Sequence, residues 1–359
     1  MTVLPTLAAL LVNLSPAASA PQVISLSGDR WRMDIRGDRG TFDFLVQPKD
    51  EPALVSIMRP GGEPAWYGYN EPAGERQTSQ IKPSAFARQG ETGPVTVRCV
   101  LDQDLGIAHE ALYYPIPEGV LVVSRLTAQS LPRDASIIRV APKMDVNTDL
   151  LTHYAFVGPD GREHTGAVAS LGPRDTYAGA GAWAPGGDQV AGLSPEYPYT
   201  LLFNPDKAVS LGVVLPLYQS TWRNAHSFLQ LWHGGFNFWY AGFLPSDALR
   251  SEHMFVLYAL QSGTPEALRN DAARVCREVS ELVAQGKVQA PALAEMLAAR
   301  GRFERDWPGV RQKALAAGPT RSAWLAIQML RSARDCLDRD PVAASQLVDR
   351  ATAALQREE

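Results

Sequence analysis

The chain has 359 residues, a formal net charge of -4 at pH 7 and 45% apolar residues, the composition of a globular protein with one large or two ordinary domains. This charge gives no basic surface for a polyanion, so nucleic acid is not expected as a partner. Three widely separated cysteines show neither CxxC nor a Cys–His spacing, so neither a metal nor another cofactor is predicted.

The first twenty residues predict an export signal. MTVLPTLAALLVNLSPAASA is a short apolar run ending in Ala18-Ser19-Ala20, a small-x-small sequence of the kind that signal peptidases cleave. The run contains no Lys or Arg and is followed by Pro21, so an apolar strand or packed helix is the alternative. Neither this run nor any other segment is long enough for a transmembrane helix. We expect residues 1–20 to be a signal peptide and the mature protein to be secreted or periplasmic.

Residues 21–262 are predicted to form a β domain. Short β-type runs divided by Gly, Pro, Asn and Asp follow one another from Val23 to Leu260. No window between them has helical periodicity over twelve residues, so antiparallel pairing is expected. GVLVVSRL and AVSLGVVL predict strands covered on both faces, whereas TFDFLVQP alternates and predicts a half-exposed strand. The fold class is therefore mainly β, a large antiparallel sandwich of two sheets.

Two long Gly/Pro-rich passages, residues 60–92 and 158–198, interrupt these runs. Loops of such length in a compact domain usually have a function. Their rings either pin the loops to the sheets or line a ligand site, and Trp183 is a candidate binding residue. The aromatic residues of the two passages include Trp66, Tyr67, Tyr69, Tyr177 and Trp183.

Residues 263–359 predict an α-helical tail. Thr264 is a suitable N-cap, Pro265 suits a first helical turn, and apolar residues recur at helical spacing after them. Further helices are predicted at 291–300, 310–317, 322–337 and 341–356. The last two are expected to pair antiparallel with Trp324 at their contact. The tail is expected to pack against the sheets or to mediate self-association.

The stretch from Trp222 to Leu244 holds eight aromatic rings, two histidines and no acidic residue. Its Gly234-Gly235 pair, between two β-rich arms, predicts a hairpin with a two-residue loop. The expected cross-strand pairs are Trp232 with Asn237, Gln230 with Trp239, Phe228 with Ala241 and His226 with Phe243. Because strand residues alternate between faces, one face of this hairpin combines two tryptophans with polar groups.

That face suits a ligand better than a core. Each polar group buried there without a partner would cost roughly 1–3 kcal/mol. Two indoles with amides between them match a sugar, which has apolar C–H faces and a rim of hydroxyls. The predicted partner is a saccharide or polysaccharide; the alternative is a second core beneath a long loop. The predicted face comprises His226, Gln230, Trp232, Asn237 and Trp239.

Candidate catalytic groups are few. The sequence has no GxSxG, no HExxH and no phosphate-binding glycine loop. His226 is the candidate acid or base because it lies on the predicted binding face, with His153 or Glu252 as its partner. A structural hydrogen-bonding role is the alternative for His226. Arg223, just before the hairpin, could pair with an acidic sugar or with a local Asp.

The many-stranded β domain with aromatic loops resembles the galactose mutarotase-like β-supersandwich. Aldose epimerases carry a His followed shortly by an aromatic-Asn-Leu element on a strand that lines the sugar site, and here His233 precedes Phe236-Asn237-Phe238. The family's second His and late Glu are not recognisable in this sequence. The resemblance implies a supersandwich with a sugar-facing sheet and acid–base catalysis of the epimerase, lyase or hydrolase type. A non-catalytic carbohydrate-binding module and an envelope protein that uses the hairpin as a protein interface are the alternatives.

Overall fold

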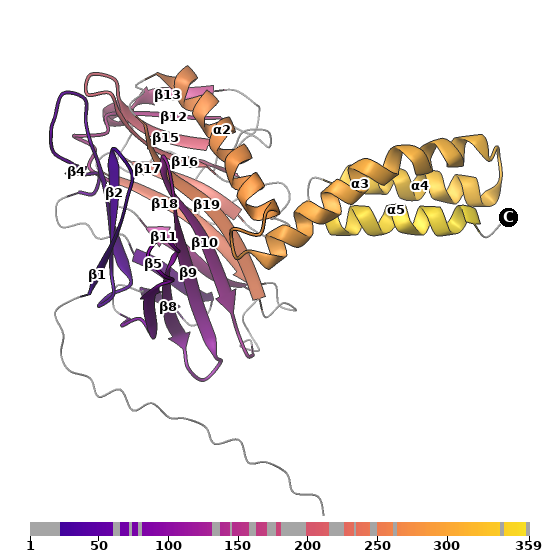
Figure 1. Cartoon of the computed structure of the whole chain (residues 1–359), viewed down its shortest axis with the longest axis horizontal. Coiled ribbons are helices and arrows are strands. Elements are labelled where there is room, and N and C mark those ends of the chain that lie inside the picture. The colour runs from indigo at the N-terminus through magenta and orange to yellow at the C-terminus, as the bar shows by residue number, and fades with distance from the viewer. Residues whose placement is uncertain are drawn as a thin grey trace, which may run out of the picture.

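A computed structural model gives the arrangement of the chain (Figure 1). The predicted signal peptide, residues 1–20, lies outside the described residues. No helix within the described part of the chain is long and apolar enough to cross a membrane. The described residues are 22–59, 65–71, 74–77, 81–130, 137–143, 146–157, 163–170, 177–180, 199–214, 226–232, 235–244, 250–260, 264–337 and 341–356.

The described strands form three antiparallel sheets. The four-stranded sheet has the order β1 (Val23–Ser27), β2 (Trp31–Arg36), β3 (Thr41–Val46), β4 (Val55–Ser56). The nine-stranded sheet has the order β13 (Glu163–Ala167), β12 (His153–Val157), β15 (Tyr199–Asn204), β16 (Val209–Val214), β19 (Arg250–Leu260), β10 (Gly119–Thr127), β9 (Ile107–Ile116), β8 (Val95–Asp102), β7 (Ala85–Arg88). The six-stranded sheet has the order β14 (Tyr177–Ala180), β17 (His226–Trp232), β18 (Gly235–Leu244), β11 (Ile137–Lys143), β5 (Ala65–Glu71), β6 (Gly74–Gln77).

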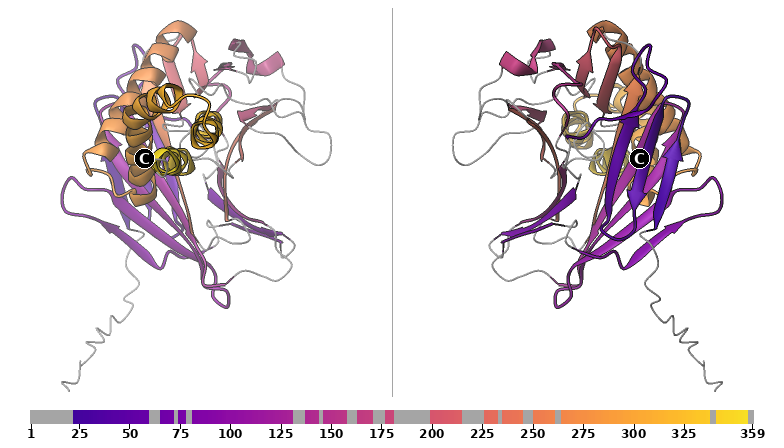
Figure 2. Two further views of the ribbon diagram at one scale, coloured as in Figure 1. Left: turned by 90° about the vertical axis from the view of Figure 1, so that its right-hand side faces the viewer. Right: turned by 90° about the vertical axis from the view of Figure 1, so that its left-hand side faces the viewer.

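The nine-stranded sheet is covered on both faces, as its continuous apolar runs predict. On β10, Val120 and Val122 belong to a core shared with the four-stranded sheet, whereas Leu121 and Val123 belong to a core shared with α2 (Pro265–Ala284). Figure 2 shows α2 on one side of this sheet and the six-stranded sheet on the other. Burying each such aliphatic side chain stabilises the fold by about 1.5–3 kcal/mol. The fold is therefore a large antiparallel sandwich, with three sheets where two were predicted.

The four-stranded sheet is fixed to the nine-stranded sheet by a buried tryptophan. Trp31 on β2 stacks on Phe44 of β3, with ring centroids 5.8 Å apart. Its indole N–H donates a 3.0 Å hydrogen bond to the carbonyl of Pro117, in the turn between β9 and β10. β3 alternates between buried and partly exposed residues from Phe42 onward, which confirms the half-exposed strand predicted from TFDFLVQP.

The two passages predicted as long loops contain regular structure. β5, β6 and β7 lie within residues 60–92, and β13, a 3-10 helix (Val168–Ser170) and β14 lie within residues 158–198. Their Gly and Pro density obscured these strands, two of which pair with distant parts of the chain. β5 pairs with β11, and β14 pairs with β17.

The helical tail begins where the sequence predicts. The Thr264 side chain accepts a hydrogen bond from the Ala267 amide and caps α2, whose Val275 and Val279 pack on the nine-stranded sheet. α3 (Pro291–Ala316) is one continuous helix, so the predicted break after residue 300 is wrong even though Pro308 lies inside the helix.

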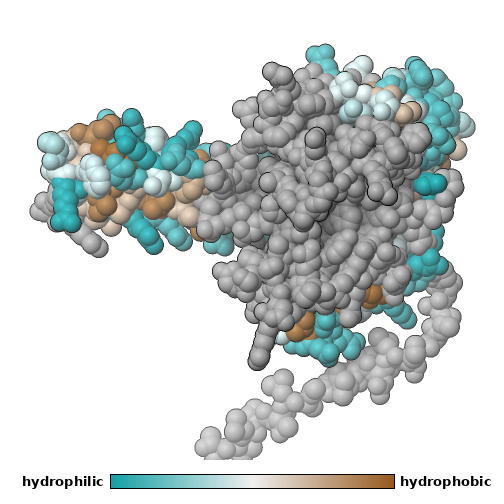
Figure 3. Space-filling model, turned by 180° about the vertical axis from the view of Figure 1, so that it is seen from behind, coloured by the Kyte–Doolittle hydropathy of each residue, from teal (hydrophilic) through white to brown (hydrophobic). Residues whose placement is uncertain are grey.

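α3 forms a three-helix bundle with α4 (Arg321–Cys336) and α5 (Pro341–Gln356), which extends away from the sheets (Figure 1). Its core contains Phe303, Leu330 and Val348. Trp324, predicted at the contact between α4 and α5, is instead 62% exposed. Small residues at Ala323, Ala326 and Ala333 take the buried stripe of α4. Seen from behind, hydrophobic residues are visible at the far end of this bundle (Figure 3).

Candidate functional site

The predicted hairpin is present as β17 and β18, but its register differs from the prediction. Trp232 pairs with Gly235, so Gly235 belongs to β18 and not to the predicted loop of two glycines. The shift is two positions, and faces alternate with a period of two, so every position keeps its predicted face. The observed pairs are His226 with Ala241, Phe228 with Trp239, Gln230 with Asn237 and Trp232 with Gly235.

The hairpin face has a neighbour that the sequence did not place there. Tyr177 on β14 is the register partner of Gln230, which in turn pairs with Asn237. These three positions form one row across adjacent strands, and directly opposed residues of antiparallel strands share a face. The pairing joins segments about fifty residues apart, and no local pattern in the sequence indicates it. Tyr177 therefore joins the predicted face.

His153, a candidate acid–base group, lies at the start of β12. Its Nδ1 is 2.9 Å from the hydroxyl of Thr152, and its ring is 5.5 Å from that of Phe203. Ala155, two residues further along the same strand, belongs to the core shared with α2. By alternation, His153 lies on that helix-covered side of the nine-stranded sheet.

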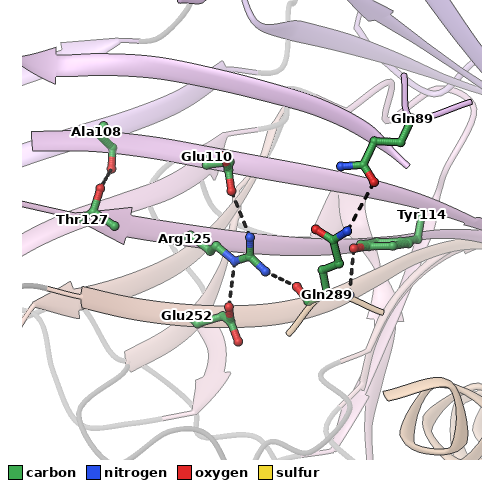
Figure 4. Close-up of polar contacts among 8 residues, drawn as sticks. All are labelled: Gln89, Ala108, Glu110, Tyr114, Arg125, Thr127, Glu252 and Gln289. Atoms are coloured by element: carbon green, nitrogen blue, oxygen red, sulfur yellow. Dashed lines mark hydrogen bonds and ion pairs between the residues drawn. The ribbon is translucent and has the colours of Figure 1, made fainter. Parts of the chain in front are cut away.

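Glu252, the candidate carboxylate, is held by Arg125. Arg125 Nε donates to Glu252 Oε2 at 2.7 Å, and its Nη1 donates to Glu110 Oε1 at 3.0 Å (Figure 4). The three residues stand opposite one another on β19, β10 and β9. The side chain of Glu252 is 8% exposed, and its Oε1 has no hydrogen-bond partner among the described residues.

The same cluster fixes the connection between α2 and α3. Arg125 Nη2 donates to the backbone carbonyl of Gln289, and the backbone N–H of Gln289 donates a 2.9 Å hydrogen bond to the hydroxyl of Tyr114 (Figure 4). Burial would lower the pKa of Arg125, but its ion pairs with Glu252 and Glu110 raise that pKa above the ordinary value. Burial raises the pKa of Tyr114. Glu252 thus belongs to a cluster that joins the helices to the sheet.

The structure does not bring the three candidate catalytic residues together. β12 pairs with β15, β15 with β16 and β16 with β19, and these pairings place His153 in the same row across the sheet as Leu260. Leu260 lies eight residues beyond Glu252 on β19. At about 3.4 Å per residue, that is roughly 27 Å along the strand, with about 14 Å across the sheet in addition. His226 lies on the six-stranded sheet. A direct proton exchange among these residues has no support in this arrangement.

A buried histidine–serine pair was not found from the sequence. His109 Nε2 on β9 is 3.0 Å from the hydroxyl of Ser124 on β10, and both residues are almost fully buried. They lie on the face of the nine-stranded sheet opposite α2, next to Leu126 and Ala111 of the core shared with the four-stranded sheet. Each polar group is satisfied inside an apolar environment, where an unpaired group would be costly. The spacing of His109 and Ser124 carries no signal in the sequence.

Two candidate binding residues, Arg223 and Trp183, lie outside the described residues. Among the residues that the structure describes, no group of three or more His, Cys, Asp or Glu side chains could hold a metal ion. The three cysteines are free thiols; Cys276 is partly buried against the core between α2 and the nine-stranded sheet, and Cys336 is partly buried against the core of the bundle.

No protein-family model matches the chain, and no curated protein matches it in sequence. Similar solved structures include the Slr1438 protein from Synechocystis sp. PCC 6803, with 10% identity and a TM-score of 0.43, covering 70% of this chain and 99% of that one. A galactose mutarotase-like protein from Lactobacillus casei ATCC 334 has 9% identity and a TM-score of 0.39, covering 66% and 100%. Alpha-N-acetylgalactosaminidase NagBb from Bifidobacterium bifidum has 13% identity and a TM-score of 0.47, covering 80% of this chain and 42% of that one. At these TM-scores the likenesses carry no argument about substrate or activity.

Proposed function

We propose that this chain is a carbohydrate-active or carbohydrate-binding protein that holds a saccharide on the β17–β18 face. The supporting observation is the register of the hairpin, in which Phe228 pairs with Trp239 and Gln230 with Asn237. This pairing keeps the positions of two tryptophans, two amides and a histidine on one face. Such a face offers apolar plates for the C–H side of a sugar and polar groups for its hydroxyls.

The expected affinity is modest. Burying part of one ring face, roughly 80–100 Å² at about 25 cal/mol per Å², contributes about 2 kcal/mol. Two such plates, reduced by the cost of association, correspond to Kd values from about millimolar to micromolar. Polar groups between the plates would set which sugar is accepted.

The second candidate function is a non-catalytic carbohydrate-binding module, in which His226, His153 and Glu252 catalyse no reaction. Glu252 is paired with Arg125, and His153 lies on the α2 side of the nine-stranded sheet, opposite the six-stranded sheet that carries His226. If the protein is an epimerase, lyase or hydrolase, His226 needs a partner other than these two. A non-catalytic binding module needs only the tryptophan rings and the side-chain amides of the hairpin.

Export is part of the proposal. The apolar run at residues 1–20 and its Ala-Ser-Ala ending would send the mature protein to the periplasm or the medium. Amino-terminal sequencing of the protein recovered from these fractions tests this, and an intact Met1 there would contradict it.

A glycan panel tests the function. We expect the wild-type protein to bind at least one saccharide and Trp239→Ala to weaken that binding about tenfold or more, because one plate is lost. Trp324→Ala, an exposed tryptophan on α4, is the matched control and should bind as wild type. If turnover of a bound glycan persists in His226→Ala, the catalytic role of that residue fails and the binding role stands. Binding that is unaffected by Trp239→Ala contradicts the proposed site.

A further inference from the structure

The register of the six-stranded sheet can be followed from the hairpin to the far edge. Phe243 on β18 pairs with Arg139 on β11, Arg139 pairs with Tyr69 on β5, and Tyr69 pairs with Glu75 on β6. These four positions form a second row, parallel to the row of Tyr177, Gln230 and Asn237. Alternation along each strand then assigns every position of the sheet to one of two faces.

The two faces differ in composition. The first, which we call the polar–aromatic face, contains the hairpin positions together with Tyr177, Phe243, Arg139, Lys143, Tyr67, Tyr69, Glu71, Glu75 and Gln77. The opposite face is mainly apolar along its central strands, with Leu229, Leu231, Phe236, Phe238, Ile138 and Val140. Removing the apolar face from water would stabilise the fold, whereas the polar–aromatic face is suited to a polar ligand.

Aromatic positions recur across the width of the polar–aromatic face. Adjacent strands lie about 4.8 Å apart, so Trp239 on β18 and Tyr69 on β5 are separated by about 10 Å across the sheet. Tyr177 on β14 and Tyr69 on β5 are four strands apart, or about 19 Å. A single pyranose ring cannot contact platforms at both ends of that distance.

We propose that the polar–aromatic face binds an oligosaccharide or polysaccharide chain across the strands, with separate ring platforms at Trp239 and at Tyr67 and Tyr69. This inference rests on the proposed function and specifies its substrate class as a chain of several rings. The positions of Arg139 and Lys143 are on β11, the strand between β18 and β5, and both residues are hydrogen-bond donors.

The charges on the face fit a hydroxyl-rich chain better than a strongly charged one. Arg139 and Lys143 on β11 are matched by Glu71 and Glu75 on β5 and β6. Donors and acceptors are thus both present, as hydroxyl groups require. An electrostatic recognition of polyanions would need an excess of cationic positions, and the face has none.

Chain-length dependence of binding tests the inference. Homologous series of glucans, galactans, xylans and galacturonans from one to six rings are titrated calorimetrically into the full-length wild-type protein. For the series that binds, we expect the affinity to rise by roughly tenfold or more between two and six rings. Tyr69→Ala should lower hexasaccharide affinity roughly 10- to 30-fold and leave disaccharide affinity unchanged, whereas Trp239→Ala should lower both.

Asn70→Ala is the matched control, because it lies one position along β5 on the opposite face and should bind as wild type. Tyr69→Leu, which keeps apolar volume, and a thermal unfolding curve for each variant separate loss of the platform from loss of the fold. Affinity that is constant from one to six rings, with Tyr69→Ala like wild type, overturns the extended site and leaves the hairpin site standing. If no series binds the wild-type protein, the proposed function itself fails.

Discussion

Arg125 is predicted to be a major stabilising residue. Its guanidinium neutralises Glu252, whose side chain is only 8% exposed, and it also holds Glu110 and the carbonyl of Gln289. Removing one partner of a buried ion pair leaves an unpaired charge and typically costs about 3–5 kcal/mol. Arg125→Met should lower the free energy of unfolding by that order, as measured by urea denaturation.

A matched arginine distinguishes this effect from a general loss of charge. Arg32 forms a 3.0 Å ion pair with Asp34, but its side chain is 43% exposed. Exposed ion pairs are worth about 0–1 kcal/mol. Arg32→Met should therefore change stability little, and equal losses in both variants would show that the Arg125 cluster is not special.

We expect the buried thiol of Cys99 to lower the stability of the folded protein at alkaline pH. Burial raises the pKa of the Cys99 thiol from 9.0 to about 11. Above pH 9 the unfolded chain ionises this thiol while the folded chain keeps it protonated, so its ionisation favours unfolding between pH 9 and 11. Cys99→Ala removes this contribution to the pH dependence of stability. The variant's free energy of unfolding is expected to be lower than that of the wild type at pH 9, and this difference should shrink by at most about 2–3 kcal/mol between pH 9 and 11. Denaturant titrations at pH 8, 9, 10 and 11 measure it, and a constant deficit would contradict the assignment.

At the scale of elements, the hairpin register is open to a direct test. Gln230 pairs with Asn237, whereas the sequence alone favoured Gln230 opposite Trp239. In a background lacking the three native cysteines, Gln230→Cys with Asn237→Cys should form a disulfide on mild oxidation, because opposed residues satisfy its geometry. Gln230→Cys with Trp239→Cys should form it much less readily. The reverse order, read by mass spectrometry, would contradict the observed register.

The elements that could be predicted from the sequence are those with local signals. The apolar run of β10 predicted a strand covered on both faces, and Thr264 predicted the start of α2; both predictions are confirmed. β5 and β14 were missed because their stability comes from pairing with β11 and β17, which a Gly/Pro-rich local sequence does not reveal. The break expected in α3 is absent because packing by Phe303 and Val310 outweighs the penalty of Pro308.

At the scale of the whole molecule, the helical bundle and the sheets have separate cores. Leu330 lies in the core of α3, α4 and α5, whereas Leu121 lies in the core between the nine-stranded sheet and α2. Leu330→Ala should cost about 2–5 kcal/mol and raise hydrogen exchange in α4 and α5 while β9 and β10 stay protected. Leu121→Ala should affect the strands. Loss of protection throughout the chain in Leu330→Ala would show a single cooperative unit.

The candidate site could be predicted only in part from the sequence. The alternation of His226, Gln230 and Trp232 within one strand fixed their common face, and that property survives the change of register. The partners from other strands, such as Tyr177 and Tyr69, depend on long-range pairing. Glu252 was chosen for its chemistry, but its pairing with Arg125 depends on the order of strands in the sheet.

The most direct test of the account is a crystal structure of the full-length protein soaked with the hexasaccharide that binds best in the titrations. We predict sugar rings on the face of the six-stranded sheet that carries Trp239 and Gln230, with the sugar chain extending toward Tyr69. Sugar density elsewhere, or both indoles of β17 and β18 sealed beneath protein, would contradict it.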